Sequence, residues 1–357
     1  MSSFDDIGPE VVLHLYDSAT SLRAVIVLDN TRRGPAKGGI RMTSSVDEQE
    51  VRELARAMTL KNALANLPFG GGKSGIVANP KDFSSDEKRL LVESFARRLS
   101  LIAPKHYIAA PDIAMGSEDM RVIAGVAGKK SVTGKPVDIG GLSGKEESTG
   151  FGVFVATKEV LLLNDQSLEG VRVAIQGFGN VGSFAARFLE QAGAVIVAVS
   201  DSSATIVNQE GFVVDDLVSF KEGGGRFSDY DAETQEASSV LFLDCDVLIP
   251  AAQARVVAEE NVSQLQAKYI VQGANLPVTE SAERLLEQRG VVIVPDILAN
   301  AGGVIASWCE HEGLSSEEMF SEIEQRISAN VSELSDVFTS SACARDACVL
   351  LAKKRLD

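Results

Sequence analysis

The sequence predicts an α/β protein of two domains, and three observations lead to this prediction. Segments with apolar residues at helical spacing alternate with short apolar runs that are typical of strands. In the second half of the chain these runs are rich in β-branched residues, which suits a parallel sheet buried on both faces. The 357 residues suffice for two domains of ordinary size.

The first half of the chain alternates between helix-like and strand-like segments. Residues 10–30 predict a helix followed by a strand in LRAVIVLD, and residues 46–66 predict a helix with acidic residues near its start. The segment KSGIVANP predicts a short strand that Asn-Pro closes. The segment SDEKRLLVESFARRLSLIA predicts a helix with a Ser or Asp cap, and HYIAAPDIAMGSEDM predicts a strand, a loop and a helix.

The second half continues the alternation more sharply. The segment GVFVATKEVLLLN predicts a helix, and VRVAIQGFGNVGSFAARFLEQAGAVIVAVSDS predicts a strand, a glycine turn, a helix and a second strand. Three later apolar runs predict further strands of a parallel sheet: VLFLDCDVLIPAA, YIVQGAN and VVIVPD. Residues 315–356 predict helix with a polar face.

Charge and composition argue against several classes of protein. The net charge of −16 and the pI near 4.8 disfavour nucleic-acid binding, because a phosphate backbone would be repelled. The three histidines are scattered and the four cysteines form no C-x-x-C pair, so we expect free thiols and no metal site. No segment resembles a signal peptide or a membrane span, so we expect a cytoplasmic protein.

The segment GFGNVG predicts a dinucleotide site. It follows an apolar strand and opens a helix, which is the context that the G-x-G-x-x-G pattern requires. Gly177 permits a tight turn, Gly179 lets the backbone approach a pyrophosphate, and Gly182 lets the helix pack closely on the strand. Asn180 and Val181 complete the turn, and the helix N-terminus would face the phosphates. We therefore expect a doubly wound, Rossmann-type domain that binds NAD or NADP.

An acidic residue at the end of the next strand bears on the choice of cofactor. Asp201 can accept hydrogen bonds from a ribose, and its charge would repel the additional phosphate of NADP, which favours NAD. Hydroxyl groups that can accommodate a phosphate crowd the same turn, so NADP stays possible: Ser200, Ser202, Ser203 and Thr205.

Three lysines in glycine-rich or apolar surroundings are candidates for substrate binding: Lys37 in GPAKGGIRM, Lys61 in MTLKNAL and Lys73 in GGGKSG. The last is no phosphate loop, because that pattern needs a glycine where Leu67 stands. Buried lysines lose proton affinity, so three of them could bind a diacid and leave one amine easily deprotonated. Asp112 follows a strand end, and the glycines around Lys73 are expected to bring backbone close to a small substrate. The alternatives are solvated lysines and a helix-capping aspartate.

Ordered motifs along nearly the whole chain resemble those of the glutamate, leucine, phenylalanine and valine dehydrogenases, and within that family the glutamate branch. These motifs are GPAKGGIRM, LPFGGGKSG, APDIAMG, VTGKP, STGFGV, GFGNVG, QGAN and NAGGVIASW. The resemblance implies a substrate domain of residues 1–148 and 328–357, a dinucleotide domain of residues 149–327 and an active-site cleft between them. It also implies a homo-oligomer, with a hexamer favoured.

The resemblance implies roles for individual residues. Lys73 matches the lysine that polarises the substrate carbonyl and activates water, and Asp112 matches the acid/base that shuttles protons to the amine and the water. Lys61 matches the lysine that holds the α-carboxylate of the substrate. Further matches line the substrate pocket at Asn300 and contact the nicotinamide end at Thr149 and Asn275.

Two positions bear on the substrate. Lys37 and Ser307 match residues that meet the distal side-chain carboxylate in the glutamate branch, and Thr133 lies near that carboxylate. In the leucine-type branch the lysine is replaced by an apolar residue, and a buried lysine without an acidic substrate would be costly. We therefore expect reversible oxidative deamination of L-glutamate to 2-oxoglutarate and ammonia, with NAD or NADP.

Two alternatives stay open, and the family pattern has departures. The alternatives are a dehydrogenase of leucine, valine or phenylalanine, and a catalytically silent NAD-binding paralogue. Ser74 stands where glycine is more usual, and Lys145 stands where arginine is frequent, which keeps the charge but loses the planar fork. The N-terminal region resembles the leucine-type length.

Overall fold

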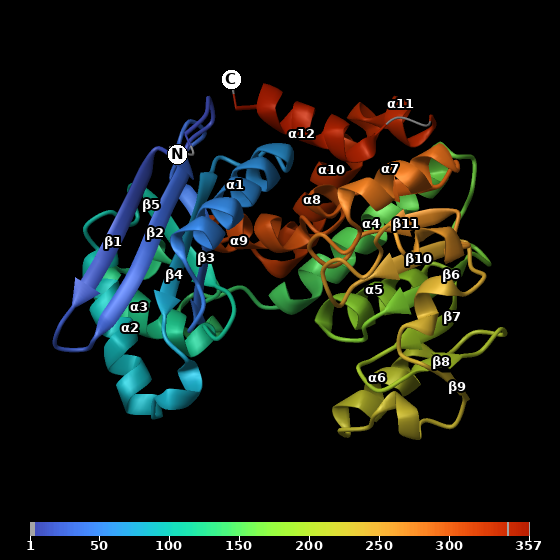
Figure 1. The fold of residues 1–357 in the computed structure, drawn as a ribbon, viewed down its shortest axis with the longest axis horizontal. Coiled ribbons are helices and arrows are strands. Elements are labelled where there is room, and N and C mark those ends of the chain that lie inside the picture. Colours follow the sequence, from blue (N-terminus) through green and yellow to red (C-terminus); the bar gives the residue numbers. More distant parts are fainter. Residues whose placement is uncertain (1–3, 341–342, 357) are drawn as a thin grey trace. The chain divides into compact units, whose positions relative to one another are not determined.

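The computed structural model describes residues 4–340 and 343–356. The chain divides into two compact units (Figure 1). The first unit comprises Met1–Lys145, Val304–Met319 and Leu351–Asp357, and the second comprises Glu146–Gly303 and Phe320–Leu350. Each unit is built on one β-sheet with helices packed against it, which confirms the predicted α/β class. Within the described residues no helix is both long and apolar enough to cross a membrane.

The first unit contains a mixed five-stranded sheet of order β1-β2-β4-β3-β5. Its strands are β1 (Val11–Asp17), β2 (Leu22–Asn30), β3 (Ala36–Thr43), β4 (Gly70–Val77) and β5 (Tyr107–Pro111). The pairs β1–β2 and β2–β4 are antiparallel, whereas β4–β3 and β3–β5 are parallel. Its helices are α1 (Glu48–Leu64), α2 (Ser85–Leu99) and α3 (Ser117–Ala127). The carboxyl ends of β3 and β5 therefore meet at one edge of the sheet.

The prediction of a helix at the start of residues 10–30 is wrong. Residues Val11–Asp17 form a strand that pairs with β2 along its whole length, from Val11 opposite Leu28 to Asp17 opposite Leu22. Leu13 and Leu15, two positions apart, pack against the core of this unit. The two-residue period of the strand therefore determines the structure, and its partner follows directly in the sequence.

Both faces of the sheet are covered by helices (Figure 1). Along β2, Ala24, Ile26 and Leu28 share a core with α2 and α3, while Val25 and Val27 pack with residues of α1. The strand is thus apolar on both sides, as expected for a sheet between two helical layers.

The helix starts follow local capping signals. The side chain of Asp47 accepts a hydrogen bond from the backbone N–H of Glu50 and caps α1. Ser84 caps α2 in a reciprocal capping box with Glu87. The observed cap is therefore Ser84, the serine just before the predicted segment, which starts at Ser85.

The glycines of β4 bring the strand close to neighbouring parts of the protein. That they also bring backbone close to a small substrate stays a prediction. A Cβ atom at Gly71 would lie 2.1 Å from Oγ1 of Thr59 in α1, and one at Gly72 would lie 2.9 Å from the ring of Tyr107. At Gly75 the nearest atom, at 2.7 Å, belongs to a valine that packs with α1. Helix α1 therefore packs directly on the backbone of the strand that carries Lys73.

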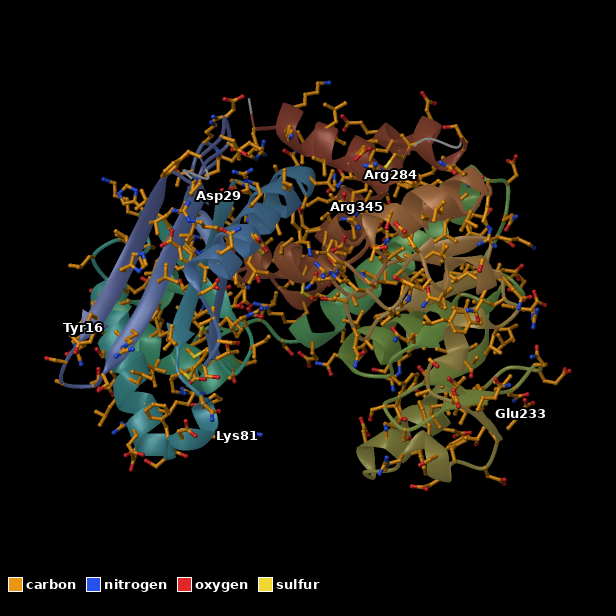
Figure 2. All side chains as sticks on the ribbon, in the orientation of Figure 1. Tyr16, Asp29, Lys81, Glu233, Arg284 and Arg345 are labelled. Carbon is orange, nitrogen blue, oxygen red and sulfur yellow. The ribbon has the colours of Figure 1, made fainter. Side chains whose placement is uncertain are left out.

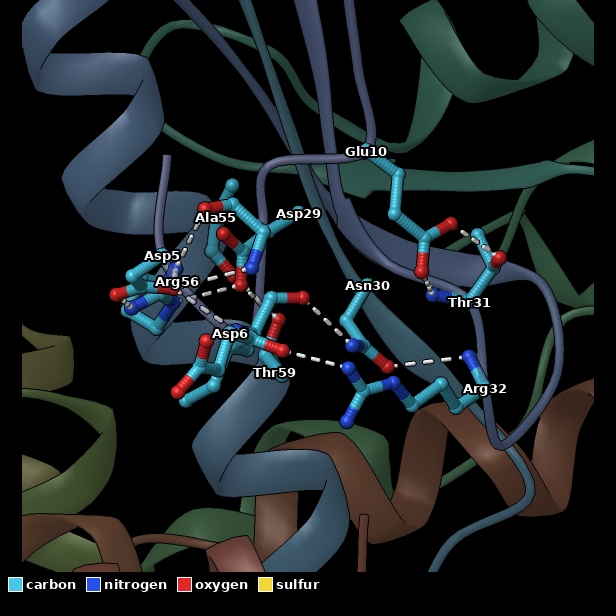
Figure 3. A network of polar contacts seen from close by, with 12 residues as sticks. Asp5, Asp6, Glu10, Asp29, Asn30, Thr31, Arg32, Ala55, Arg56 and Thr59 are labelled. Atoms are coloured by element: carbon cyan, nitrogen blue, oxygen red, sulfur yellow. Dashed lines mark hydrogen bonds and ion pairs between the residues drawn. The ribbon is translucent and has the colours of Figure 1, made fainter. Parts of the chain in front are cut away.

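A polar network fixes α1 to the end of β2 (Figure 3). The buried carboxylate of Asp29 lies 2.9 Å from Nε of Arg56 and accepts a hydrogen bond of 2.6 Å from Oγ1 of Thr59. Arg56 also pairs with Asp5 at 2.7 Å. Lys61 follows Arg56 and Thr59 in the same helix, so this network holds the helix that carries Lys61.

The second unit contains a seven-stranded sheet of order β12-β11-β10-β6-β7-β8-β9. Its strands are β6 (Arg172–Gln176), β7 (Val195–Ser200), β8 (Thr205–Val207), β9 (Glu233–Gln235), β10 (Val247–Pro250), β11 (Tyr269–Val271) and β12 (Val292–Val294). The strands from β12 to β7 run parallel, and β8 and β9 continue the sheet antiparallel. This confirms the doubly wound sheet, although only the second part of VLFLDCDVLIPAA is a strand; Ser239–Phe242 forms a 3₁₀ turn.

The second unit also holds α4 (Ser148–Leu163), α5 (Asn180–Gln191), α6 (Val214–Glu222), α7 (Glu280–Gln288), α8 (Asp296–Ala299) and α11 (Ser335–Phe338). Three helices contribute to both units: α9 (Gly302–Glu312), α10 (Ser316–Glu333) and α12 (Ala344–Lys354). The tail at residues 315–340 and 343–356 is therefore mainly helical, as predicted, and residues 341–342 of the predicted stretch lie outside the described residues.

One buried charge network holds α12 within the second unit. Arg345 of α12, labelled in Figure 2, donates to both carboxylate oxygens of Glu283 in α7 at 2.8 Å. It also lies 2.9 Å from Asp296 at the start of α8. The three side chains are at most 9% exposed, so they compensate one another's charge away from water.

Candidate active site

Lys73 and Asp112, which the sequence predicts as catalytic, meet in the first unit. Lys73 stands in β4 and Asp112 directly after β5, and Nζ lies 2.7 Å from Oδ2. Lys73 is 7% exposed, and this burial lowers the pKa of its ammonium, against the opposing effect of Asp112. Burial alone would raise the pKa of Asp112, but the ammonium of Lys73 and the guanidinium of Arg41 hold it below its usual value. The pair can thus exchange a proton over one hydrogen bond.

Arg41 is a member of this site that the sequence reasoning missed. It lies in β3 and approaches Oδ2 of Asp112 with Nε at 3.1 Å, while Nη1 reaches Glu50 of α1 at 2.5 Å. The GPAKGGIRM motif contains this arginine, but only the sheet order places it next to a residue after β5. Arg41 adds a second positive charge that keeps Asp112 ionised.

Gly39 leaves the space that the Lys73–Asp112 pair occupies. A Cβ atom at this position would lie 2.8 Å from Cβ of Asp112 and 3.2 Å from Nζ of Lys73. A glycine in β3 is therefore needed for the approach of the two catalytic candidates.

Lys37 and Thr133 lie at a second place in the first unit. Lys37 is 2% exposed, and Nζ donates to the carbonyl of Ala109 over a long 3.5 Å. Burial and the nearby ammonium of Lys145 lower the pKa of Lys37 well below its ordinary value. Thr133 donates its backbone N–H to the same carbonyl at 2.9 Å, and its buried hydroxyl has no hydrogen-bond partner among the described residues. Two buried polar groups thus converge on Ala109 with bonding capacity left over.

A carboxylate that the sequence reasoning missed stands beside them. Glu310 of α9 lies 2.7 Å from Nζ of Lys135 and 2.7 Å from Nζ of Lys145, with its side chain fully buried. Burial alone would raise the pKa of Glu310, but Lys145 and Lys135 lower it to about 2. Lys145, in the position where arginine is frequent, therefore binds a protein carboxylate here.

The two remaining substrate candidates of the first unit are also placed by helices. Lys61 lies in the last turn of α1 and is half-buried. Ser307 lies in α9, one helical turn before Glu310, and is buried. Ser74, the departure next to Lys73, donates its hydroxyl to the buried Tyr107 at 3.0 Å.

The turn GFGNVG of the second unit has the geometry of a dinucleotide turn. Gly177 has φ +89°, and a Cβ atom there would lie 2.5 Å from Cβ of Ala252; one at Gly182 would lie 1.9 Å from the carbonyl of Gly177. A Cβ atom at Gly179 would meet nothing within 4 Å, so this side of the turn is open. Asn180 begins α5, whose free N–H groups suit a pyrophosphate.

A cavity of about 700 Å³ adjoins this turn, which is large enough for part of a dinucleotide. It is lined by residues that include Gly177, Gly179, Ser200, Asp201 and Lys221. Val181 lies inside the first turn of α5. The residues present therefore fit NAD or NADP.

Asp201, the expected ribose acceptor, is already bonded within the protein. Oδ1 accepts hydrogen bonds from the backbone N–H and hydroxyl of Ser203, and Oδ2 accepts from Phe227 N–H at 3.0 Å. Nζ of Lys221 lies 2.6 Å from Oδ2. Although burial alone would raise the pKa of Asp201, these donors lower it well below its usual range. Sequence reasoning missed Lys221, which compensates the negative charge at this turn.

Asn275 and Asn300 meet in the second unit, which also carries Thr149. Asn300, after α8, donates from Nδ2 to Oδ1 of Asn275 at 3.1 Å and to the carbonyl of Gly273 at 3.2 Å. Thr149 lies in the first turn of α4, beside Gly303, where a Cβ atom would approach its hydroxyl to 2.9 Å.

The described part of the chain contains no cluster of metal-ligating side chains, and burial raises the pKa of three of its thiols. Residues 4–340 and 343–356 contain no group of three or more His, Cys, Asp or Glu side chains that could hold a metal ion. The cysteines carry thiols, and burial raises the pKa of Cys245 and of Cys348 to about 12. Such thiols are poor nucleophiles near neutral pH.

Comparison with family models gives two matches that together span most of the chain. Residues 140–353 match the model described as Glutamate/Leucine/Phenylalanine/Valine dehydrogenase. Residues 12–128 match the model described as Glu/Leu/Phe/Val dehydrogenase, dimerisation domain.

Relatives and solved structures carry related names. Glutamate dehydrogenase A2 of Halobacterium salinarum is 44% identical over 290 residues, which cover 79% of this chain and 70% of that protein. An NAD-specific glutamate dehydrogenase of Staphylococcus aureus is 38% identical over 292 residues, with the same coverage of 79% and 70%. The hetero-hexameric glutamate dehydrogenase of Thermus thermophilus in its Leu-bound form superimposes with a TM-score of 0.85 at 29% identity, over 98% of this chain and 88% of that one.

Proposed function

Because the chain belongs to the glutamate/leucine/phenylalanine/valine dehydrogenase family, we propose that it is a glutamate dehydrogenase. The reaction is the reversible oxidative deamination of L-glutamate to 2-oxoglutarate and ammonia. The two relatives described above are named glutamate dehydrogenases, which supports the glutamate branch.

The observation that carries the substrate assignment is the arrangement of Lys37 and Thr133. A buried ammonium with one long contact of 3.5 Å and a buried hydroxyl without a partner among the described residues both face a cost that a ligand would remove. A carboxylate supplies acceptors for both groups at once, whereas the side chain of leucine or phenylalanine supplies none. We assign the distal carboxylate of glutamate to Lys37 and Thr133, together with Ser307.

The Lys73–Asp112 pair supports the catalytic assignment. NAD or NADP, when bound, supplies a hydride acceptor for the Cα atom of the substrate. Burial makes it easier for Lys73 to lose its proton, so its neutral amine can activate water for addition to the imine. In the reverse direction its protonated form can donate to the carbonyl and polarise it. Asp112, bonded to Lys73 at 2.7 Å, can carry protons to and from the amine and the water. We assign Lys61 to the α-carboxylate and Asn300 to the substrate pocket.

For the cofactor we propose NAD with tolerance of NADP. Gly177, Gly179, Asn180, Val181 and Gly182 would cradle the pyrophosphate, and Thr149 and Asn275 would contact the nicotinamide end. Asp201 supports NAD, but its charge is compensated by Lys221 at 2.6 Å, which weakens the repulsion of the 2′-phosphate. The relative from Staphylococcus aureus is named NAD-specific.

For the assembly and location we propose a homo-oligomer, with a hexamer favoured, in the cytoplasm. The name of the Thermus thermophilus structure describes a hetero-hexamer, and one matched family model is described as a dimerisation domain. Light scattering after gel filtration measures the mass directly, and a monomer would contradict the proposal.

The test is an initial-rate assay at the NADH absorbance band. Wild type is given ammonium with either 2-oxoglutarate or 2-oxoisocaproate, each with NADH and with NADPH. We expect turnover with 2-oxoglutarate, and we expect Lys37→Leu to lower this rate and raise the rate with 2-oxoisocaproate. Lys81→Leu, an exposed lysine of the same unit, is the matched control. A wild type that prefers 2-oxoisocaproate would indicate the leucine-type alternative, and NADH binding without any turnover would indicate the silent paralogue.

A further inference from the structure

Glu310 is bonded more extensively than a simple counter-ion requires. Its two carboxylate oxygens accept the backbone N–H of Gly134 at 2.9 and 2.7 Å, and one of them accepts the backbone N–H of Lys135 at 3.2 Å. The same carboxylate receives the ammonium groups of Lys135 and Lys145 at 2.7 Å each. A fully buried carboxylate with these donors is held in one position.

The backbone contacts of Glu310 bear on Thr133. The N–H of Thr133 is bonded to the carbonyl of Ala109, and the N–H of the next residue, Gly134, is bonded to Glu310. The peptide that carries Thr133 is therefore pinned on both sides, by β5 and by α9. Lys37 bonds to the same carbonyl of Ala109, so Thr133 and Lys37 share one contact point on β5, and Glu310 holds the residue next to Thr133.

The charges around Lys37 lead to the same residue. Lys145, Lys135 and Lys73 all act on Lys37 as like charges, and Glu310 is the opposing carboxylate. Lys135 and Lys145 are already engaged with Glu310, whereas Lys37 has only its long contact of 3.5 Å with a carbonyl. Lys37 is thus the ammonium left to meet an incoming anion.

We propose that Glu310 is a positioning residue for recognition of the distal carboxylate of the substrate. Its carboxylate pairs with the ammonium groups of Lys135 and Lys145 and bonds to the backbone next to Thr133. The ammonium of Lys37 and the hydroxyl of Thr133 are then left to bind the distal carboxylate. This inference rests on the proposed glutamate dehydrogenase activity and assigns a determinant of its substrate choice.

The test compares two oxoacids in Glu310→Gln, which keeps the shape of the side chain and removes the charge. We expect kcat/KM for 2-oxoglutarate to fall by about tenfold or more, mainly through KM, because Lys37 and Thr133 lose their alignment. We expect kcat/KM for 2-oxovalerate, which lacks the distal carboxylate, to change by less than about threefold. Glu312→Gln removes an exposed carboxylate from the same helix and should change neither value.

A second variant separates positioning from folding. Glu310→Asp keeps the charge but shortens the reach, and we expect a loss on 2-oxoglutarate between wild type and Glu310→Gln with a melting temperature closer to wild type. Equal losses on both oxoacids in the folded variants would show a purely structural role and overturn the inference. In other words, a ratio of the two kcat/KM values equal to that of wild type overturns the inference. The wild-type arm reports separately on the proposed function, because without a preference for 2-oxoglutarate that function itself fails.

Discussion

Nζ of Lys73 lies 2.7 Å from Oδ2 of Asp112, although the two residues come from different strands. Replacing Asp112 by Asn keeps the shape but leaves Lys73 and Arg41 without their shared carboxylate. We expect kcat to fall by about 10²–10⁴-fold, since both proton transfer and the charge balance are lost. NADH binding, measured by fluorescence, should be unchanged. Asp138→Asn, an exposed aspartate that pairs with Arg121, is the control and should retain wild-type kcat.

A methyl group at Gly39 should disturb the same pair without removing either member. Its Cβ atom would enter to within 2.8 Å of Cβ of Asp112, so the two side chains must separate. We expect Gly39→Ala to lower kcat by about 10²-fold, the scale of a misplacement of about 1 Å. Gly125→Ala, where an added Cβ atom meets nothing within 4 Å, should be neutral. A Gly39→Ala enzyme with normal kcat would show that this contact is unimportant.

Lys221 should control the response to the 2′-phosphate of NADP. Lys221→Ala exposes the uncompensated charge of Asp201, and we expect KM for NADPH to rise by about tenfold while KM for NADH changes little. Lys268→Ala, which removes a lysine paired with Asp246 at 2.9 Å in the same unit, is the matched control. Parallel increases of both KM values would instead show that Lys221 supports the turn as a whole.

Arg345 should be essential for stability. Arg345→Met leaves Glu283 and Asp296 buried without their cation, which we expect to cost about 3–5 kcal/mol of unfolding free energy. Adding Glu283→Gln and Asp296→Asn should restore part of this loss, because the uncompensated charges are then absent. Arg284→Met, at the exposed neighbour on α7 that Figure 2 also labels, should change the melting temperature little. Equal effects of the two arginine variants in urea unfolding would contradict the network.

Glu310 should make stability depend on pH in the acid range. Its pKa is lowered from 4.5 to about 2 in the folded chain, so the folded state favours the ionised carboxylate more than the unfolded state does. The stabilisation, about 3 kcal/mol from this shift, is fully present above pH 4.5 and is lost as pH falls toward 2. Urea unfolding at one protein concentration should give a larger unfolding free energy for wild type than for Glu310→Gln. This difference should become smaller below pH 5. A difference independent of pH would argue against an ionised Glu310.

The dinucleotide half of the fold could be predicted because its information is local. The glycine turn, its flanking strand and its helix lie in one continuous segment, and the structure confirms each of them. The strand at Val11–Asp17 was missed because a short apolar segment fits a helix or a strand, and only its pairing with β2 decides.

The site was predictable residue by residue but its connections were not. The sequence motifs single out Lys37, Lys73 and Asp112, whereas Arg41 and Glu310 act through contacts across 71 and up to 176 positions of the chain. Such contacts depend on sheet order and helix placement, which leave no spacing pattern in the sequence. Lys221 was missed for the same reason, since it lies in α6, 20 positions after its partner Asp201 in the turn between β7 and β8.

The close packing of α1 on β4 also affects how this chain can diverge from its relatives. At Gly116 and Gly125 an added Cβ atom would meet open space, so drift at these positions is tolerated. At Gly71 any side chain would collide with the backbone of α1 within 2.2 Å, and no change of one neighbouring residue relieves a clash with backbone. At Gly70 the nearest atom is likewise a backbone carbonyl, at 1.8 Å, so packing alone favours glycine at both positions. If an alignment showed these glycines to be invariant, that would not mark them as catalytic, because packing against the neighbouring backbone already requires them. Lys73 lies next to glycines that are kept for packing.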